Sequence, residues 1–388
     1  MTVKVALIAN SPISIKSMGG GDRILIELAR SWQRLGAQLT LFGPPEAKAV
    51  CDLGGINVAF VETSNFDVKK LGTIRTYLRR ILKAILGQQY FGSYDVIYSA
   101  SESLPDVALS ARIKKQNRTA VWVIGFYLIA PNPFLGEVNF VLNNLLQYAQ
   151  QKMSLVLMKC FGTDAVFVLG GDDKKYLEGL GFKNILRIGG GVDLNFINSI
   201  PEQEKVYDAC FIGRISKQKG VDDLLKVWRE VVNQKSKARL AFIGWGHPGQ
   251  QETLLDEIKR EGLHKNIEYF GFLDGAEKYR ILKSSKLLLF PSKYESFGIV
   301  VLEALAAGVP VVAYGLSVLR ENFKEGVAFV GIGDVSGLAS QCRFFVEHQD
   351  ERDSLALLGR KLAQNFDWEK VGADTYNYIV DQFSSPKS

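Results

Sequence analysis

The sequence predicts an α/β protein with two doubly wound parallel-sheet domains. Short apolar, β-branched runs alternate with segments of helical period from one end of the chain to the other. Near-continuous apolar strands separated by helices are typical of parallel sheets covered on both faces. The length of 388 residues exceeds what one ordinary core requires, which favours two such sheets in series.

The expected strands fall into two groups. Those of the first domain are Val3–Ile8, Gln38–Phe42, Val58–Val61, Val96–Tyr98, Ala120–Ile124 and Ala165–Leu169. Those of the second domain are Tyr207–Ile212, Arg239–Ile243, Ile267–Phe270, Leu287–Phe290, Val309–Ala313 and Ala328–Val330. In such folds ligands lie at the carboxyl ends of the strands.

We place the domain boundary near Asn198 to Lys205, where Pro201–Glu204 is typical of an exposed connector. The first domain is then expected over residues 1–197 and the second over 198–367. Residues 368–388 begin with an amphipathic segment, which predicts a final helix over Trp368–Phe383.

Composition excludes several classes. Apolar residues make up 47% and charged residues 23%, and no segment is apolar enough for a transmembrane helix. Four widely spaced cysteines without a CxxC pair or a secretory signal favour a cytoplasmic protein and disfavour a thiolate metal site. The net charge of +6 can serve anionic phosphates or an anionic membrane surface, and does not by itself indicate nucleic acid.

The strongest motif runs from Glu295 to Glu303, directly after the strand that ends at Phe290. Gly298 lets the backbone turn tightly, and a helix is expected from about Ile299. The free amides of its first turn favour a diphosphate, whereas the two carboxylates suit neutral sugar hydroxyls. Taken alone, the glutamates also fit a solvated loop acid and a first-turn acid.

Two further motifs follow strands. Gly213-Arg214 ends one strand and Lys219-Gly220 opens the next helix, so a guanidinium and an ammonium can bind phosphates there, while Lys217 fits an ordinary loop charge. Residues 19–21 form a glycine run before the helix expected over Ile24–Leu35. This run lets the backbone approach a ligand, but it lacks the GxGxxG pattern of nicotinamide cofactor sites.

These motifs, with Gly190–Asp193, Gly244-Trp245-Gly246 and Ala307–Pro310, occur in one order over nearly the whole chain. In this the chain resembles the large retaining glycosyltransferase family of the GT-B fold with a Glu-x7-Glu signature (glycosyltransferase family 4, or group 1, type). The resemblance implies two Rossmann-like domains that face each other across a cleft. It also implies that the last helix, within 368–388, crosses back onto the N-terminal, acceptor-binding domain.

The resemblance implies a role for each matching residue. Arg214 and Lys219 would bind the donor diphosphate and, with Glu295, which would hold a hydroxyl of the donor sugar, form the catalytic set. Glu303 would hold the ribose of the nucleotide. The remaining donor-binding positions would be Gly20, Gly213, Gly244, Gly246, Gly271, Phe272, Phe297, Gly298 and Ile299.

The implied reaction is transfer of a hexose from a UDP-, GDP- or ADP-linked sugar to a hydroxyl of a glycan or lipid-linked acceptor, with retention. It would serve polysaccharide, glycolipid or lipid-linked glycan synthesis. No cofactor and no metal are expected, because such transferases generally need no metal at the diphosphate. Asp172 and Asp173, before an expected helix, fit caps better than metal ligands.

The sequence departs from the family at a histidine that many members carry in the N-terminal domain. The three histidines, His247, His264 and His348, all lie in the second half and are expected at the surface. Near the expected position stand Gly125, Phe126 and Tyr127; Tyr127 could equally form an apolar platform for acceptor or sugar. Two alternatives therefore stay open, a nucleotide-sugar epimerase on the same fold and a catalytically silent nucleotide-sugar-binding subunit.

Residues 69–86 form a separate feature. Apolar residues recur at helical spacing and are accompanied by positive charge: Leu71, Ile74, Leu78, Ile81, Leu82 and Ile85, with Lys70, Arg75, Arg79, Arg80 and Lys83. A basic amphipathic helix can lie on an anionic membrane, which would make the protein peripheral on the inner face. The alternative is a helix packed on the core with a solvated basic face.

Overall fold

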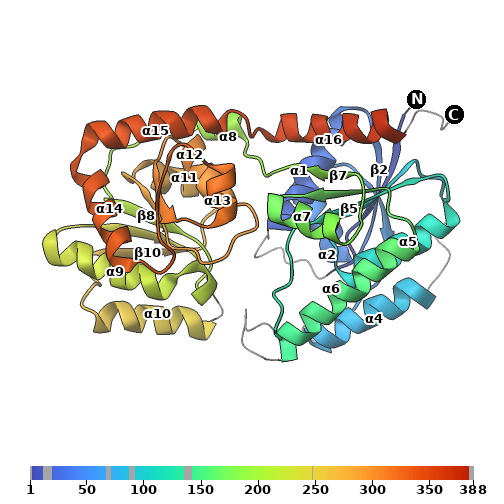
Figure 1. Ribbon diagram of the computed structural model, residues 1–388, viewed down its shortest axis with the longest axis horizontal. Helices are drawn as coiled ribbons and strands as arrows, with labels where there is room; N and C mark the ends of the chain where they lie inside the picture. Colours follow the sequence, from blue (N-terminus) through green and yellow to red (C-terminus); the bar gives the residue numbers. More distant parts are fainter. Residues whose placement is uncertain are drawn as a thin grey trace. The chain divides into compact units, whose positions relative to one another are not determined.

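The computed structural model describes residues 2–11, 20–66, 71–86, 92–134, 142–246 and 248–383. The chain divides into two compact units (Figure 1). Unit 1 comprises Met1–Gly190 and Trp368–Ser388, and unit 2 comprises Gly191–Asp367. Each has its own parallel sheet, so the predicted fold class of two Rossmann-like domains is confirmed.

Unit 1 has a seven-stranded sheet in the order β3-β2-β1-β4-β5-β6-β7. Its strands are β1 Lys4–Ile8, β2 Gln38–Gly43, β3 Ala59–Glu62, β4 Val96–Ser99, β5 Val121–Phe126, β6 Ala165–Val168 and β7 Ile185–Arg187. Its helices include α1 Gly20–Arg34, α2 Pro45–Leu53, α4 Thr73–Leu86, α5 Leu104–Gln116, α6 Leu142–Cys160, α7 Gly171–Gly179 and α16 Trp368–Phe383. The six expected strands are all present, and β7 is an additional short edge strand.

One face of this sheet is covered by helices α4, α5 and α6 (Figure 1), which share a core with the strands. The final helix α16 packs against α1. There, the indole nitrogen of Trp32 donates to Oγ1 of Thr375 at 3.1 Å. The chain therefore returns to unit 1 at its C-terminal end.

Unit 2 has a six-stranded sheet in the order β10-β9-β8-β11-β12-β13, and all its strand pairs are parallel. Its strands are β8 Ala209–Ile212, β9 Leu240–Ile243, β10 Ile267–Gly271, β11 Leu288–Phe290, β12 Val311–Tyr314 and β13 Val327–Val330. Its α-helices include α8 Leu194–Ser199, α9 Val221–Gln234, α10 Pro248–Arg260, α11 Gly275–Lys283, α12 Ile299–Ala306, α13 Ser317–Asn322, α14 Val335–Glu347 and α15 Gln349–Ala363. Helices α9, α10 and α14 contribute to a hydrophobic core with the strands of this unit.

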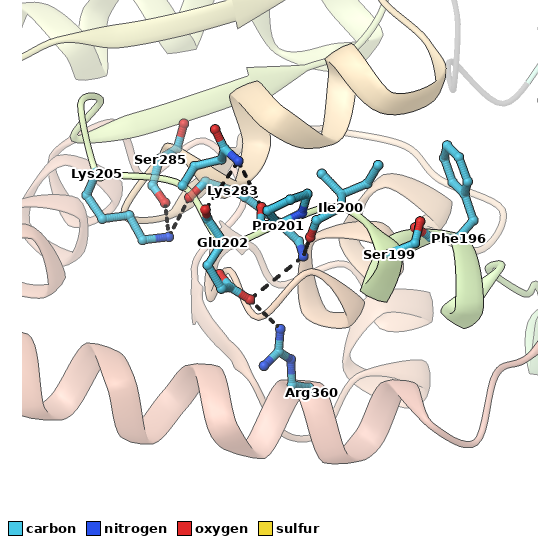
Figure 2. A network of polar contacts seen from close by, with 10 residues as sticks. Phe196, Ser199, Ile200, Pro201, Glu202, Lys205, Lys283, Ser285 and Arg360 are labelled. Atoms are coloured by element: carbon cyan, nitrogen blue, oxygen red, sulfur yellow. Dashed lines mark hydrogen bonds and ion pairs between the residues drawn. The ribbon is translucent and has the colours of Figure 1, made fainter.

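The expected boundary between residues 197 and 198 lies inside unit 2, which begins at Gly191. Figure 2 shows why the polar segment 200–205 is part of this unit. The buried Lys283 ammonium donates to the carbonyl of Ile200 at 2.6 Å, and the Lys205 ammonium donates to the carbonyls of Lys283 and Ser285 at 2.7 and 3.0 Å. Glu202 accepts from Arg360 on α15 at 3.0 Å. Most of the segment is exposed, as expected, but ionic and backbone contacts fix it within unit 2, so it does not connect the two units.

Candidate functional site

In the sheet of unit 2, the order in which the chain adds strands reverses beside β8. The chain winds outward from β8 to β9 and β10 on one side, and then returns to continue through β11, β12 and β13 on the other. The carboxyl ends of β8 and β11 therefore lie at the switch point, which is where doubly wound sheets bind ligands. We call residues 213–220 and 291–298, which follow these two strands, the switch loops.

Backbone contacts hold the two switch loops together. The amide of Lys293 donates to the carbonyl of Gln218 at 2.8 Å. The side-chain amide of Gln218 donates back to the carbonyl of Tyr294 at 3.3 Å. The position of one loop thus fixes that of the other.

Gly220 lies where the switch loops approach each other closely. Its φ of +69° lies in the left-handed region, and a Cβ there would be 1.9 Å from the carbonyl oxygen of Pro291. No side chain fits this space, and L-residues avoid this backbone conformation. The glycine in the Lys219-Gly220 motif is therefore required by packing between the loops as well as by the turn.

An ion pair joins the switch loops. The ammonium of Lys219 lies 2.6 Å from Oε1 of Glu295, and the two side chains are only 16% and 10% exposed. Ser216 caps the short 3₁₀ turn Lys217–Lys219 by accepting from the amide of Lys219. Two residues 76 positions apart that were predicted to contact the same donor are thus brought into direct contact.

Arg214 follows β8 at the same switch point and is exposed. Within the part of the chain that the structure describes, its guanidinium has no hydrogen bond or ion pair. An exposed guanidinium at the carboxyl end of a parallel strand can bind an anion in bidentate fashion.

Glycines line the carboxyl ends of three neighbouring strands in unit 2. The amide of Gly213 donates to the carbonyl of Ile243 at 3.0 Å, and the amide of Gly244 donates to the carbonyl of Gly271 at 2.8 Å. A Cβ on Gly244 would lie 2.1 Å from the carbonyl oxygen of Gly213. The predicted positions Gly213, Gly244 and Gly271 therefore form one continuous edge of bare backbone.

Two more predicted positions flank this edge. Gly246 is tightly packed, because a Cβ there would lie 3.0 Å from Cβ of Ile215. Phe272 follows β10 and is 54% exposed, so its ring is accessible to a ligand. A flat aromatic surface of this kind suits stacking with a planar base.

The N-terminus of α12 is the third part of the site. Gly298 has a φ of +95°, and a Cβ there would lie 2.4 Å from Cδ2 of Leu319. Phe297 is buried, with its ring 5.5 and 5.9 Å from those of Phe323 and Phe366. Its side chain belongs to the core, so only its backbone can face a ligand, together with the first-turn amide of Ile299.

Glu303 is buried in α12 and pairs with residues that the sequence analysis did not single out. Its Oε1 accepts from the Lys278 ammonium at 2.8 Å and from the Tyr279 hydroxyl at 3.2 Å. Lys278 also lies 3.5 Å from Asp274. Lys278 and Tyr279 come from α11, 25 and 24 residues earlier in the chain, and no local pattern marks them. A ribose hydroxyl would have to share this carboxylate with them.

In unit 1 the predicted residue Gly20 is the exposed first residue of α1, and Gly19 lies outside the described residues. Tyr127 is buried, with its hydroxyl 2.5 Å from that of Tyr98, and burial raises the pKa of both phenols. Its ring is also 3.7 Å from where a Cβ of Gly21 would be. Tyr127 is therefore a hydrogen-bonded core residue and not an exposed platform.

The switch of unit 1, between β1 and β4, contains a group that the sequence did not reveal. Oδ1 of the buried Asp106 accepts from the backbone amides of Asn10 and Ser11 at 2.6 and 2.7 Å. Its Oδ2 accepts from the Ser101 hydroxyl at 2.6 Å. Burial raises the pKa of Asp106 to about 6.

Other predicted positions are accounted for as follows. His264 and His348 are exposed, as expected, and His247 lies outside the described residues. Asp172 and Asp173 lie in the first turn of α7, whose N-cap is Gly170, so they are not the cap residues that we expected. Among the residues described, no three His, Cys, Asp or Glu side chains gather as a metal site, and no helix is long and apolar enough to cross a membrane.

Comparison with known proteins bears on this site. Residues 193–362, almost all of unit 2, match the family model for glycosyl transferases group 1. In unit 2 the chain is therefore similar to the group 1 glycosyl transferases. A segment of 171 residues is 30% identical to glycogen synthase of Mycobacterium tuberculosis, covering 43% of this chain and 41% of that enzyme. The matched part is thus less than half of this relative's length.

Solved structures match over nearly the whole chain. Sucrose-phosphate synthase from Thermosynechococcus elongatus has a TM-score of 0.76 at 16% identity, covering 99% of this chain and 100% of that one. Anabaena HepE, solved with UDP and glucose, has a TM-score of 0.73 at 19% identity, covering 98% and 100%. These likenesses confirm the GT-B fold.

Proposed function

We propose that the protein is a glycosyltransferase that transfers a hexose from a nucleotide-diphosphate sugar to an acceptor hydroxyl. The observation that supports this most directly is the Lys219–Glu295 pair at the switch point of unit 2. It places a cation for phosphate beside a carboxylate for sugar hydroxyls. The group 1 glycosyltransferase match covers the same unit.

In this proposal the chain contributes electrostatics and positioning. Arg214, Lys219 and the N-terminus of α12 stabilise the negative charge that develops on the departing nucleotide diphosphate. Glu295 accepts a hydrogen bond from a hydroxyl of the donor sugar, and Glu303 accepts one from the ribose. Lys278 and Tyr279 hold Glu303 in place for this contact.

We further propose that the reaction retains the configuration of the sugar. The acceptor hydroxyl attacks the anomeric carbon from the face that the diphosphate leaves, and a phosphate oxygen takes the proton. The C–O bond to the acceptor forms as the C–O bond to the diphosphate breaks, so no protein nucleophile is required. Cationic side chains that neutralise the diphosphate stabilise it as a leaving group, so this reaction does not require a bound metal.

The donor nucleotide is UDP, GDP or ADP in this proposal, and UDP is the first to test because the structurally similar HepE was solved with it. The acceptor is a glycan or lipid-linked glycan. The reaction is placed in the cytoplasm, in keeping with four cysteines that are all free thiols.

The test is a thermal-shift screen of the wild-type protein, Arg214→Ala and Lys217→Ala against these diphosphates and their sugar conjugates. A ligand at about one hundred times its Kd adds roughly 2.7 kcal/mol of stability, enough for a rise of a few degrees in Tm. We expect one nucleotide to stabilise the wild type and Lys217→Ala, but Arg214→Ala much less. Equal stabilisation of Arg214→Ala would contradict the site, and no shift with any nucleotide would contradict the donor.

A further inference from the structure

Helix α4 of unit 1 exposes its apolar side. Ile74, Leu78, Leu82 and Ile85 are each between 50% and 56% exposed. Their spacing places them along one stripe of the helix. In the described part, 71–86, the helix packs on the core through its other side, and this apolar stripe stays accessible.

The buried side of α4 is instead small and polar. Thr76, Arg80 and Ala84 are 0%, 1% and 2% exposed. The Arg80 guanidinium donates to the carbonyl of Asn10 at 3.3 Å and lies 3.7 Å from Glu46. Arg80 therefore anchors α4 to its own unit and does not belong to a surface cluster.

Positive charge lies next to the apolar stripe. Arg75, Arg79 and Lys83 follow one another at intervals of four residues and are exposed. The sequence of α4 contains no aspartate or glutamate. Beside the stripe, a pocket of about 400 Å³ is lined by Phe66, Arg79, Leu82, Lys83 and Leu86. Apolar and cationic side chains thus share one accessible surface.

Helix α6 contacts α4 and also exposes apolar side chains. The hydroxyl of Tyr77 on α4 donates to Oε1 of Gln150 on α6 at 2.7 Å, so the two helices touch. On α6, Met153 and Val156 are 57% and 58% exposed. We call Ile74, Arg75, Leu78, Arg79, Leu82, Lys83, Ile85, Met153 and Val156 the α4–α6 surface.

We propose that the α4–α6 surface docks on an anionic phospholipid membrane. Exposed leucine and isoleucine side chains can enter the boundary between headgroups and acyl chains, while the neighbouring arginines and lysine contact the phosphates. A stripe of both kinds without any acidic residue on α4 complements a negatively charged lipid surface. The docking does not depend on the proposed transferase activity. The proposal of a lipid-linked acceptor rests on both the docking and that activity.

The test uses the full chain in flotation with phosphatidylcholine vesicles, prepared with or without phosphatidylglycerol. We expect the wild type to bind the anionic vesicles at least tenfold more tightly than the neutral ones. Leu78→Asn/Leu82→Asn and Arg79→Gln/Lys83→Gln should each weaken binding to anionic vesicles at least tenfold. Both pairs of side chains are exposed, so we expect the variants to fold. An unchanged Tm will show that they do. Arg80 is left intact because it is buried.

The matched control is Leu357→Asn/Leu358→Asn, a pair of exposed leucines on α15 of unit 2, which should bind anionic vesicles like the wild type. Absence of wild-type binding, or wild-type binding by Leu78→Asn/Leu82→Asn, would overturn the proposal. So would a wild-type dimer that this variant converts to a monomer without any change in vesicle binding, since the surface would then be a protein interface. The nucleotide thermal shift is measured on the same variants, so a failure of membrane binding remains distinct from a failure of the donor site.

Discussion

The switch points of the two units share a topology but differ in chemistry. In unit 2 the switch point beside β8 presents Arg214 and Lys219, with the N-terminus of α12 close to the same loops. In unit 1 the loop after β1 directs the amides of Asn10 and Ser11 at the buried carboxylate of Asp106. The backbone of unit 1 at this point therefore already has an anionic acceptor.

This difference shows that the fold supplies a switch point but does not determine its ligand. Amides and cations that are available to a ligand favour a phosphate, whereas amides that already bind a carboxylate do not. In the proposed function, the nucleotide diphosphate therefore binds mainly to unit 2. We propose that unit 1 contributes chiefly to binding the neutral hydroxyls of an acceptor.

The largest effect is expected from Gly220→Ala, because its Cβ would overlap the carbonyl of Pro291 and separate the switch loops. We expect it to lower the free energy of unfolding of unit 2 by more than about 4 kcal/mol. The control is Gly262→Ala, whose φ of +72° is similar but whose Cβ would meet nothing within 4 Å. That substitution should cost about 1 kcal/mol. Urea unfolding measures both, and equal losses would show that the loops do not need this close contact.

The next effect is on catalysis. With a donor identified as above, Lys219→Met should lower kcat about 10²- to 10³-fold, because it removes one of the cations that stabilise the leaving diphosphate. Lys217→Met, two residues away on an exposed side chain, should change kcat less than about threefold. Steady-state kinetics with the sugar nucleotide compares them. Similar losses in both variants would mean that general positive charge, and not the position beside Glu295, matters.

In unit 1 the role of the buried Asp106 carboxylate is tested by measuring the stability of the protein at different pH values. Burial raises the folded-state pKa of Asp106 to about 6, above the value near 4 of an unfolded aspartate. The folded protein thus holds this proton more tightly, so the contribution of Asp106 to stability is complete below about pH 4 and is lost as the pH rises through 6. Asp106→Asn does not ionise, and its amide oxygen can still accept from Asn10 and Ser11.

We therefore expect the stability of Asp106→Asn, relative to the wild type, to improve by up to about 3 kcal/mol between pH 4 and pH 8. Urea unfolding at the two pH values measures the difference. A relative stability that stays constant, or that moves toward the wild type at high pH, would show that the carboxylate is stabilised as an anion by its amide donors.

Features encoded within a short stretch of sequence could be predicted, whereas features that depend on contacts between distant residues could not. Buried parallel strands are continuous apolar runs, so twelve strands and the motifs at their ends were visible in the sequence. The short edge strand β7, Ile185–Arg187, is half-exposed and gave no such run. Spacing also showed which residues of α4 share a face, but not that the polar face with Arg80 is the buried one.

Pairings across the fold were not visible. Glu303 was predicted as a ligand-binding acid, yet its contacts with Lys278 and Tyr279 depend on how α11 packs beside α12. The same holds for Lys283, whose buried ammonium fixes the exposed segment 200–205 through the carbonyl of Ile200. Contacts of this kind depend on tertiary packing, which leaves no periodicity in the sequence.

The smallest effect is expected at Tyr127, near the position where a histidine is common in the family that the chain resembles. Because its hydroxyl is buried against that of Tyr98, Tyr127→Phe removes one hydrogen bond within the core of unit 1 and should cost about 1 kcal/mol of stability. The nucleotide affinity, which we assign to unit 2, should not change. Calorimetry and nucleotide titration separate the two quantities. A Tyr127→Phe protein with normal stability but weaker donor binding would show that this phenol contacts the donor, and the division of roles between the two switch points would have to be redrawn.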